Sequence, residues 1–129
     1  MSHCARTIVL LLVLLSGCAS MSDLKPGDGR KLTIRDHDYP VIWRAALFVA
    51  EEHFDIHEQD IATGVILAYR EASFVDVPAW IGIYITPPVP GAAEYIVEVV
   101  RRKAAFTIFV QPQPWERKVL RDLALSLEG

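Results

Sequence analysis

The residue with the most distinctive chemistry is Cys18, one of two cysteines in a chain of 129 residues. A cysteine thiol is a nucleophile, so it can be acylated or oxidised. Cys18 follows the small residues Ser16 and Gly17, and Leu15 before them closes an unbroken apolar run over residues 8–15. The basic residue Arg6 precedes this run. A basic residue, a short apolar run and small residues at its end are typical of a secretory signal.

The stretch Leu15-Ser16-Gly17-Cys18 resembles the lipobox of bacterial lipoprotein precursors. The resemblance implies that signal peptidase II recognises Leu15, Ser16 and Gly17 and cleaves before Cys18, whose thiol carries a diacylglyceryl group. Acyl chains would then hold the protein at a membrane. Ala19 follows Cys18 where inner-membrane members of the family have aspartate, which implies an outer-membrane protein that faces the periplasm.

An uncleaved anchor or a buried helix is the alternative interpretation of the apolar run. Its eight residues are too few to cross a bilayer core, which needs about 20 in a helix. Removal of the first 17 of 129 residues leaves 112, which is enough for one small domain with its own core. The mature chain would keep only Cys18, so no internal disulfide is expected.

The charge distribution argues against a nucleic-acid partner. The whole chain has a formal charge of −3, and loss of Arg6 makes the mature chain −4. It has no basic stripe of the kind that nucleic-acid-binding proteins present. The one basic cluster, residues 101–103, is interpreted as a solvated strand end rather than an anion site.

Three regions are expected along the chain. Residues 1–17 are the signal peptide, and residues 18–31, which are polar and contain two glycines and a proline, form a flexible lipidated tether. Residues 32–129 form a single domain. Its candidate strands, read from alternation of apolar and polar residues, are 32–35, 54–58, 65–70, 80–85, 95–100 and 106–110. Its candidate helices, read from apolar stripes at helical spacing, are 41–53, capped by Asp38 or Tyr39, and 115–127.

Strands follow one another instead of alternating with helices, which predicts an α+β fold. We expect an antiparallel sheet of four to five strands, in the order β-α-β(4)-α, with two helices packed on one face. This order resembles the helix-grip domains of the outer-membrane assembly lipoprotein BamC. The resemblance is topological and covers roughly residues 32–127, so it assigns no functional residue.

Three expectations concern single side chains. Leu123 belongs to the apolar stripe of the second helix and should be buried, whereas its neighbour Asp122 should lie on the outside of that helix. Glu98 alternates with core residues of its strand and should stay in solvent, as should Glu94 and Arg102. Phe48 falls near the polar side of the first helix, so either that helix is covered on both sides or Phe48 belongs to a surface patch; we expect a partly covered aromatic.

No residue pattern predicts a metal site, a cofactor or a catalytic residue. His53 and His57 are four apart, but the first helix is expected to end between them, so they would not share a helical face. Asp36, His37 and Asp38 could offer ligands from a loop, although capping and turn roles explain them as well. No serine lies in a Gly-x-Ser-x-Gly turn, and no glycine-rich phosphate loop is present.

These observations favour a structural or protein-interaction lipoprotein of the cell envelope, which is not an enzyme and meets another envelope protein. The alternative is a small-ligand binder lined by Trp80, Tyr84, Phe109 and Trp115. A pocket between Trp43 or Trp115 and the sheet would favour the binder. A filled core with an exposed apolar helix or strand would favour the interaction protein.

Overall fold

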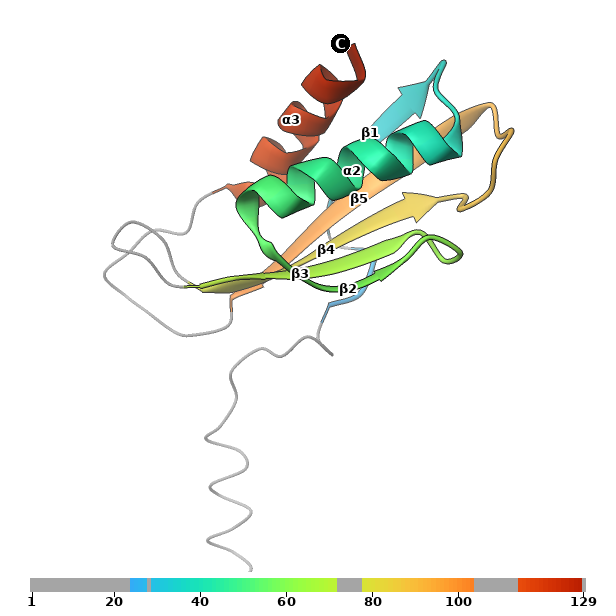
Figure 1. The fold of residues 1–129 in the computed structure, drawn as a ribbon. Helices are drawn as coiled ribbons and strands as arrows, with labels where there is room; N and C mark the ends of the chain where they lie inside the picture. The colour runs from blue at the N-terminus through green and yellow to red at the C-terminus, as the bar shows by residue number, and fades with distance from the viewer. Residues whose placement is uncertain (1–23, 28, 72–77, 104–113, 129) are drawn as a thin grey trace, which may run out of the picture.

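The computed structural model describes residues 24–27, 29–71, 78–103 and 114–128. Its strands are β1 (Arg30–Arg35), β2 (Asp55–Asp60), β3 (Val65–Arg70), β4 (Ala79–Thr86) and β5 (Glu94–Lys103), and its helices are α2 (Tyr39–His53) and α3 (Trp115–Glu128). They form a five-stranded sheet with both helices on one side of it (Figure 1). The predicted α+β class and the β-α-β(4)-α order are confirmed. The candidate strand over residues 106–110 lies outside the described residues.

The sheet is antiparallel throughout, in the order β1-β5-β4-β3-β2. Strands β2, β3, β4 and β5 each pair with the strand that follows or precedes them in the sequence. Strand β1, the first of the described strands, instead pairs with β5, the last of them, and Ile34 lies opposite Tyr95. Strands β1 and β2 are therefore the two edges of the sheet that the described residues form. We call the helix-covered side of the sheet the inner face and the other side the outer face. None of the helices in the described ranges has the length and apolar character needed to cross a membrane.

Helix α2 begins at Tyr39 because Asp38 caps it, as predicted. The Asp38 carboxylate accepts hydrogen bonds from the backbone N–H of Gly91 at 2.8 Å and of Tyr39 at 2.9 Å. The Tyr95 hydroxyl lies 3.1 Å from the same oxygen. These bonds, that from Gly91 first, lower the pKa of Asp38 below its usual 3.8. One carboxylate thus ties the start of α2 to the β4–β5 connection.

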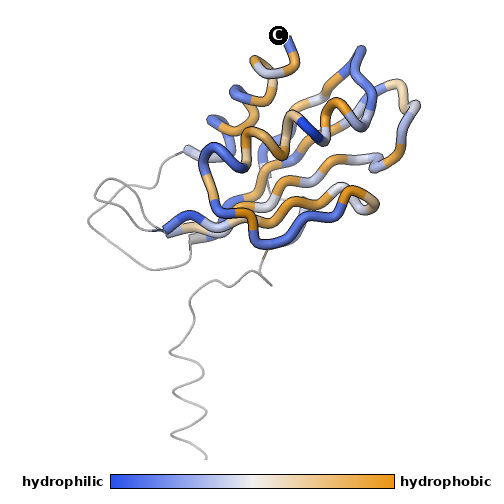
Figure 2. The backbone as a smooth tube through the Cα atoms, viewed as in Figure 1, coloured by the Kyte–Doolittle hydropathy of each residue, from blue (hydrophilic) through white to orange (hydrophobic). Residues whose placement is uncertain are grey.

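The core lies between the inner face and the two helices. Figure 2 shows apolar residues along the central strands and on both helices. The largest fully buried side chains of this cluster are Ile42, Val49, Ile66, Ile81, Ile83, Ile85, Tyr95, Val97, Val99, Val119 and Leu123. The prediction that Leu123 is buried is confirmed. Alternation along each strand selects the inward side chains, and the stripes of α2 and α3 meet them.

Two predictions about charged side chains of β5 are wrong. Glu98 is only 5 % exposed, because backbone of the residues before β1 packs on it. Arg101, expected in a solvated cluster, faces inward opposite Ile81 and keeps 18 % of its side-chain surface exposed. Its Nε lies 3.4 Å from an Oε1 of Glu116 in α3. This ion pair connects the end of the sheet to the second helix.

Candidate functional site

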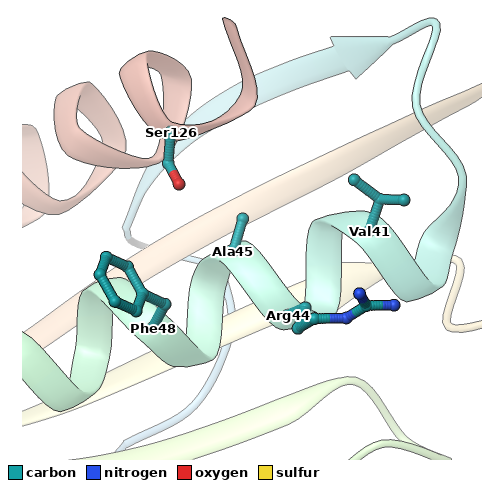
Figure 3. Close-up of a pocket in the computed structure, with 5 residues that line it drawn as sticks. All are labelled: Val41, Arg44, Ala45, Phe48 and Ser126. Atoms are coloured by element: carbon teal, nitrogen blue, oxygen red, sulfur yellow. The ribbon is translucent and has the colours of Figure 1, made fainter. Parts of the chain in front are cut away.

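An apolar hollow lies between the two helices, on the side away from the sheet. Val41, Arg44, Ala45 and Phe48 line it from α2, and Ser126 lines it from α3 (Figure 3). Its volume is about 310 Å³, and it opens to solvent. We call this hollow the α2–α3 groove.

The groove follows from the helical repeat of α2. Val41, Ala45 and Phe48 are spaced at i, i+4 and i+7, which places them on one stripe of the helix. A neighbouring stripe of α2, about 90° further round the helix and including Ile42 and Val49, is already buried against the sheet. Helix α2 therefore has two apolar stripes, of which the tertiary structure covers one.

Phe48 resolves the alternative that the sequence left open, because it belongs to a surface patch. The side chain is 56 % exposed, and Val41 in the same stripe is 46 % exposed. In Figure 3 the Phe48 ring and Ala45 lie on the side of α2 that faces Ser126. Complete burial of an exposed phenylalanine is worth roughly 1.5–3 kcal/mol, so a partner that covers the exposed 56 % of Phe48 would gain roughly half of that.

Arg44 gives the groove a charge. Its guanidinium group is exposed at the edge of the groove (Figure 3), and no carboxylate in the described part of the chain forms an ion pair with it. Arginine binds carboxylates through two parallel hydrogen bonds when the geometry allows. The groove therefore combines an apolar floor with a cation that is available to an acidic group.

A second open hollow, of about 330 Å³, lies where α2 passes into β2. Its lining is polar and largely acidic: Glu51, Glu52, His53, Phe54, Asp55, Tyr69, Arg70 and Glu71. His53 is already engaged here, with Nε2 at 2.8 Å from Oδ2 of Asp122 in α3. Arg70 donates a hydrogen bond of 2.6 Å to the His53 carbonyl, and its guanidinium lies 4.4 Å from the Trp115 ring centre. These contacts join α2, α3 and β3, which is a structural role.

Asp122 was expected on the outside of α3, and the structure corrects this. The carboxylate keeps 22 % of its side-chain surface exposed and faces His53 across the helix pair. Burial alone would raise the pKa of Asp122, but hydrogen bonds from His53 and Arg121 outweigh it, so the pKa lies below the usual 3.8.

The other two histidines among the described residues also have structural positions. His37 has Nδ1 at 3.0 Å from the Arg35 carbonyl and Nε2 at 3.0 Å from the Leu127 carbonyl, so it connects the end of β1 to the end of α3. His57 lies in β2, its ring centre 5.5 Å from that of Trp80. Of the residues that the structure describes, no three of the histidine, cysteine, aspartate or glutamate type gather in a way that could hold a metal ion.

The aromatic lining proposed for a ligand binder is not assembled in one place. Trp80 and Tyr84 lie on the outer face, whereas Trp115 is 3 % exposed in the core on the inner face. Trp43 is buried in the same core, and neither hollow described above includes it. Phe109 lies outside the described residues. The described side chains thus lack the shared pocket that the binder would need.

The lipobox residues Leu15, Ser16, Gly17 and Cys18 lie outside the described residues. Sequence reasoning noted Phe48 but missed Arg44 and Ser126 as neighbours in a groove. The i, i+4, i+7 stripe of Val41, Ala45 and Phe48 was a visible signal for half of it. The packing of α3 beside α2 was not readable from spacing. No model of a known protein family matches the chain, and no curated protein matches it.

Proposed function

We propose that the protein is a lipoprotein of the bacterial cell envelope, held at the outer membrane by acyl chains on Cys18, whose periplasmic domain binds another envelope protein. The domain contributes binding rather than catalysis. The lipobox-like stretch before Cys18 supports the anchor, and the α2–α3 groove supports the binding role.

The observation that carries the binding role is the exposure of Phe48 in a domain whose described core side chains are buried. Isolated exposed apolar side chains are common on protein surfaces. Here, however, Phe48 lies beside Val41 and Ala45 in one hollow, while the side chains beneath α2 are completely buried. This combination favours an interaction surface over a ligand cavity.

The groove also indicates the chemistry of the partner. An amphipathic segment would suit it, with apolar side chains for Phe48 and Val41 and a carboxylate for Arg44. A groove of this size accommodates a few side chains, so the contact is small and its intrinsic affinity is modest. Anchoring at a membrane compensates for this because it raises the effective concentration of the two proteins.

Complementation of a deletion strain tests both parts of the proposal. Genes for Phe48→Ser and Arg44→Glu should each fail to correct an envelope defect of the deletion strain that the wild-type gene corrects. Both proteins should stay folded, because both side chains are exposed. Cys18→Ser should fail as well, and mass spectrometry should find acyl chains on Cys18 of the wild type. Ile61→Ser is the matched control, since Ile61 is 52 % exposed but lies at the β2–β3 turn.

Three outcomes would contradict the proposal. If mass spectrometry of the mature protein finds an unmodified residue before Cys18, the lipid anchor is refuted. Full complementation by Phe48→Ser and Arg44→Glu would remove the groove as the binding surface. Failure of a triple His37, His53 and His57 to Gln variant that is still folded would instead indicate chemistry at the histidines.

A further inference from the structure

A buried carboxylate on the outer face holds the chain just before β1. The Glu98 carboxylate accepts two hydrogen bonds from the backbone N–H of Gly27, at 2.9 and 3.0 Å, and one from that of Gly29, at 2.8 Å. Glu98 is 5 % exposed and belongs to β5, far from both glycines in sequence. We call these three bonds the Glu98–glycine contact. A carboxylate that binds several backbone N–H groups in this way makes strong, charge-assisted hydrogen bonds.

Both glycines are required by the geometry of this contact. A Cβ on Gly29 would come within 2.4 Å of the Val99 carbonyl oxygen and 2.8 Å of a Val100 methyl group, so the backbone lies directly on β5. Gly27 has a φ of +133°, which side-chain-bearing residues rarely adopt. The sequence therefore contains a carboxylate and two glycines that fit each other, where composition alone indicated a flexible tether.

The contact is on the side of the sheet opposite the α2–α3 groove. Glu98 pairs in register with Lys31 and Tyr84, and it alternates with Val97 and Val99, which face the helices. In Figure 1 the helices lie above the sheet, and the blue segment that precedes β1 lies below it. Because β1 is an edge strand, a chain that enters it freely could come from either face. The Glu98–glycine contact selects the outer face.

We propose that Glu98 is a docking site for the tether at Gly27 and Gly29, and that it orients the anchored domain with its outer face toward the membrane and its groove away from it. The orientation rests on the proposed function, because it requires the anchor at Cys18. Eight residues lie between Cys18 and Gly27, so the chain from one to the other spans at most about 30 Å when extended. The groove lies beyond the sheet and a helix layer about 10 Å thick, so it faces a partner in the periplasm rather than lipid.

Hydrogen exchange tests the docking site without reference to the anchor. The full chain has seven glycines, so selective ¹⁵N-glycine labelling gives a small set of amide signals. In the wild type, the Gly27 and Gly29 amides should be protected. In Glu98→Ala they should exchange about tenfold faster or more, as expected when charged hydrogen bonds are lost. Gly29→Ala should have the same effect on Gly27, whereas the control Glu94→Gln should leave both amides unchanged.

The amides of Gly64 and Gly91 report whether the variants still fold. They bond to the Asp60 carbonyl and the Asp38 carboxylate, both remote from Glu98. Wild-type Gly27 and Gly29 amides that exchange as fast as those of Glu98→Ala would overturn the docking site.

Energy transfer to a headgroup-labelled vesicle tests the orientation in the lipidated protein. A fluorophore on Thr33→Cys reports the outer face, and one on Ser126→Cys reports the groove. Transfer should be stronger from Thr33→Cys, and Glu98→Ala should reduce the difference. Equal transfer from both positions in the wild type would overturn the orientation. Full complementation by Phe48→Ser would refute the groove and leave the docking site standing, so the two failures are distinguishable.

Discussion

Leu123→Ala should be among the most damaging truncations of an aliphatic side chain in this domain. Leu123 is 0 % exposed and packs in the core between α3 and the sheet. Removal of a fully buried leucine side chain loses its transfer free energy and leaves a cavity, which together cost about 2–5 kcal/mol. Domains of this size are stable by roughly 5–15 kcal/mol, so the substitution should remove a large part of the total.

Leu125→Ala provides a matched control on the same helix. Leu125 is 58 % exposed, and the substitution has the same small effect on helix propensity as Leu123→Ala. Its cost should stay within about 0.5 kcal/mol. The difference between the two variants therefore isolates burial.

Urea unfolding of the full chain, followed by tryptophan fluorescence and far-UV circular dichroism, measures both costs. The two variants should share one dependence on urea concentration and differ in midpoint. Equal costs at positions 123 and 125, or a cost below about 1 kcal/mol at Leu123, would refute the packing of α3 on the sheet.

Two further predictions concern acid stability and turn glycines. Because the pKa of Asp122 is lowered in the folded protein, its stabilising contribution is complete above the usual pKa of 3.8 and is lost as the pH falls through the folded-state pKa. Between pH 5 and 2, the wild type should therefore lose more free energy of unfolding than Asp122→Asn, as measured by chemical unfolding. Equal losses would contradict this. Gly64→Ala should lower the midpoint of thermal unfolding more than Gly91→Ala does. Both glycines have a positive φ, but only at Gly64 would an added Cβ meet backbone, at 2.5 Å from the Ile85 carbonyl oxygen. The reverse order would contradict the turn geometry.

Local patterns predicted most of the fold. Alternation in Val65–Arg70 and in the strand after Pro78 identified β3 and β4, because neighbouring side chains of a strand point to opposite faces. The apolar stripe ending at Leu127 identified α3. Consecutive strands without intervening helices made an antiparallel sheet the natural outcome. In these cases a few adjacent residues carry the whole signal.

Alternation placed Glu98 on the correct face of the sheet, but the expected exposure to solvent failed for a physical reason. A carboxylate between core residues should face water, and the pattern contains no information about what covers the other side of the sheet. Gly27 and Gly29 cover it, and they are about 70 residues away in the sequence. Arg101 and Asp122 were misplaced in the same way, since each is paired with a residue on another element.

The sequence by itself determined the class of fold, the face of each strand and helix that is apolar, and the chemical character of Cys18 and its neighbours. Only the tertiary structure decided that the Phe48 stripe remains exposed, that Arg44 and Ser126 join it in a groove, and that Glu98 holds the glycines before β1. Periodicity is a property of a few neighbouring residues, whereas a groove and a buried carboxylate require segments from distant parts of the chain to meet.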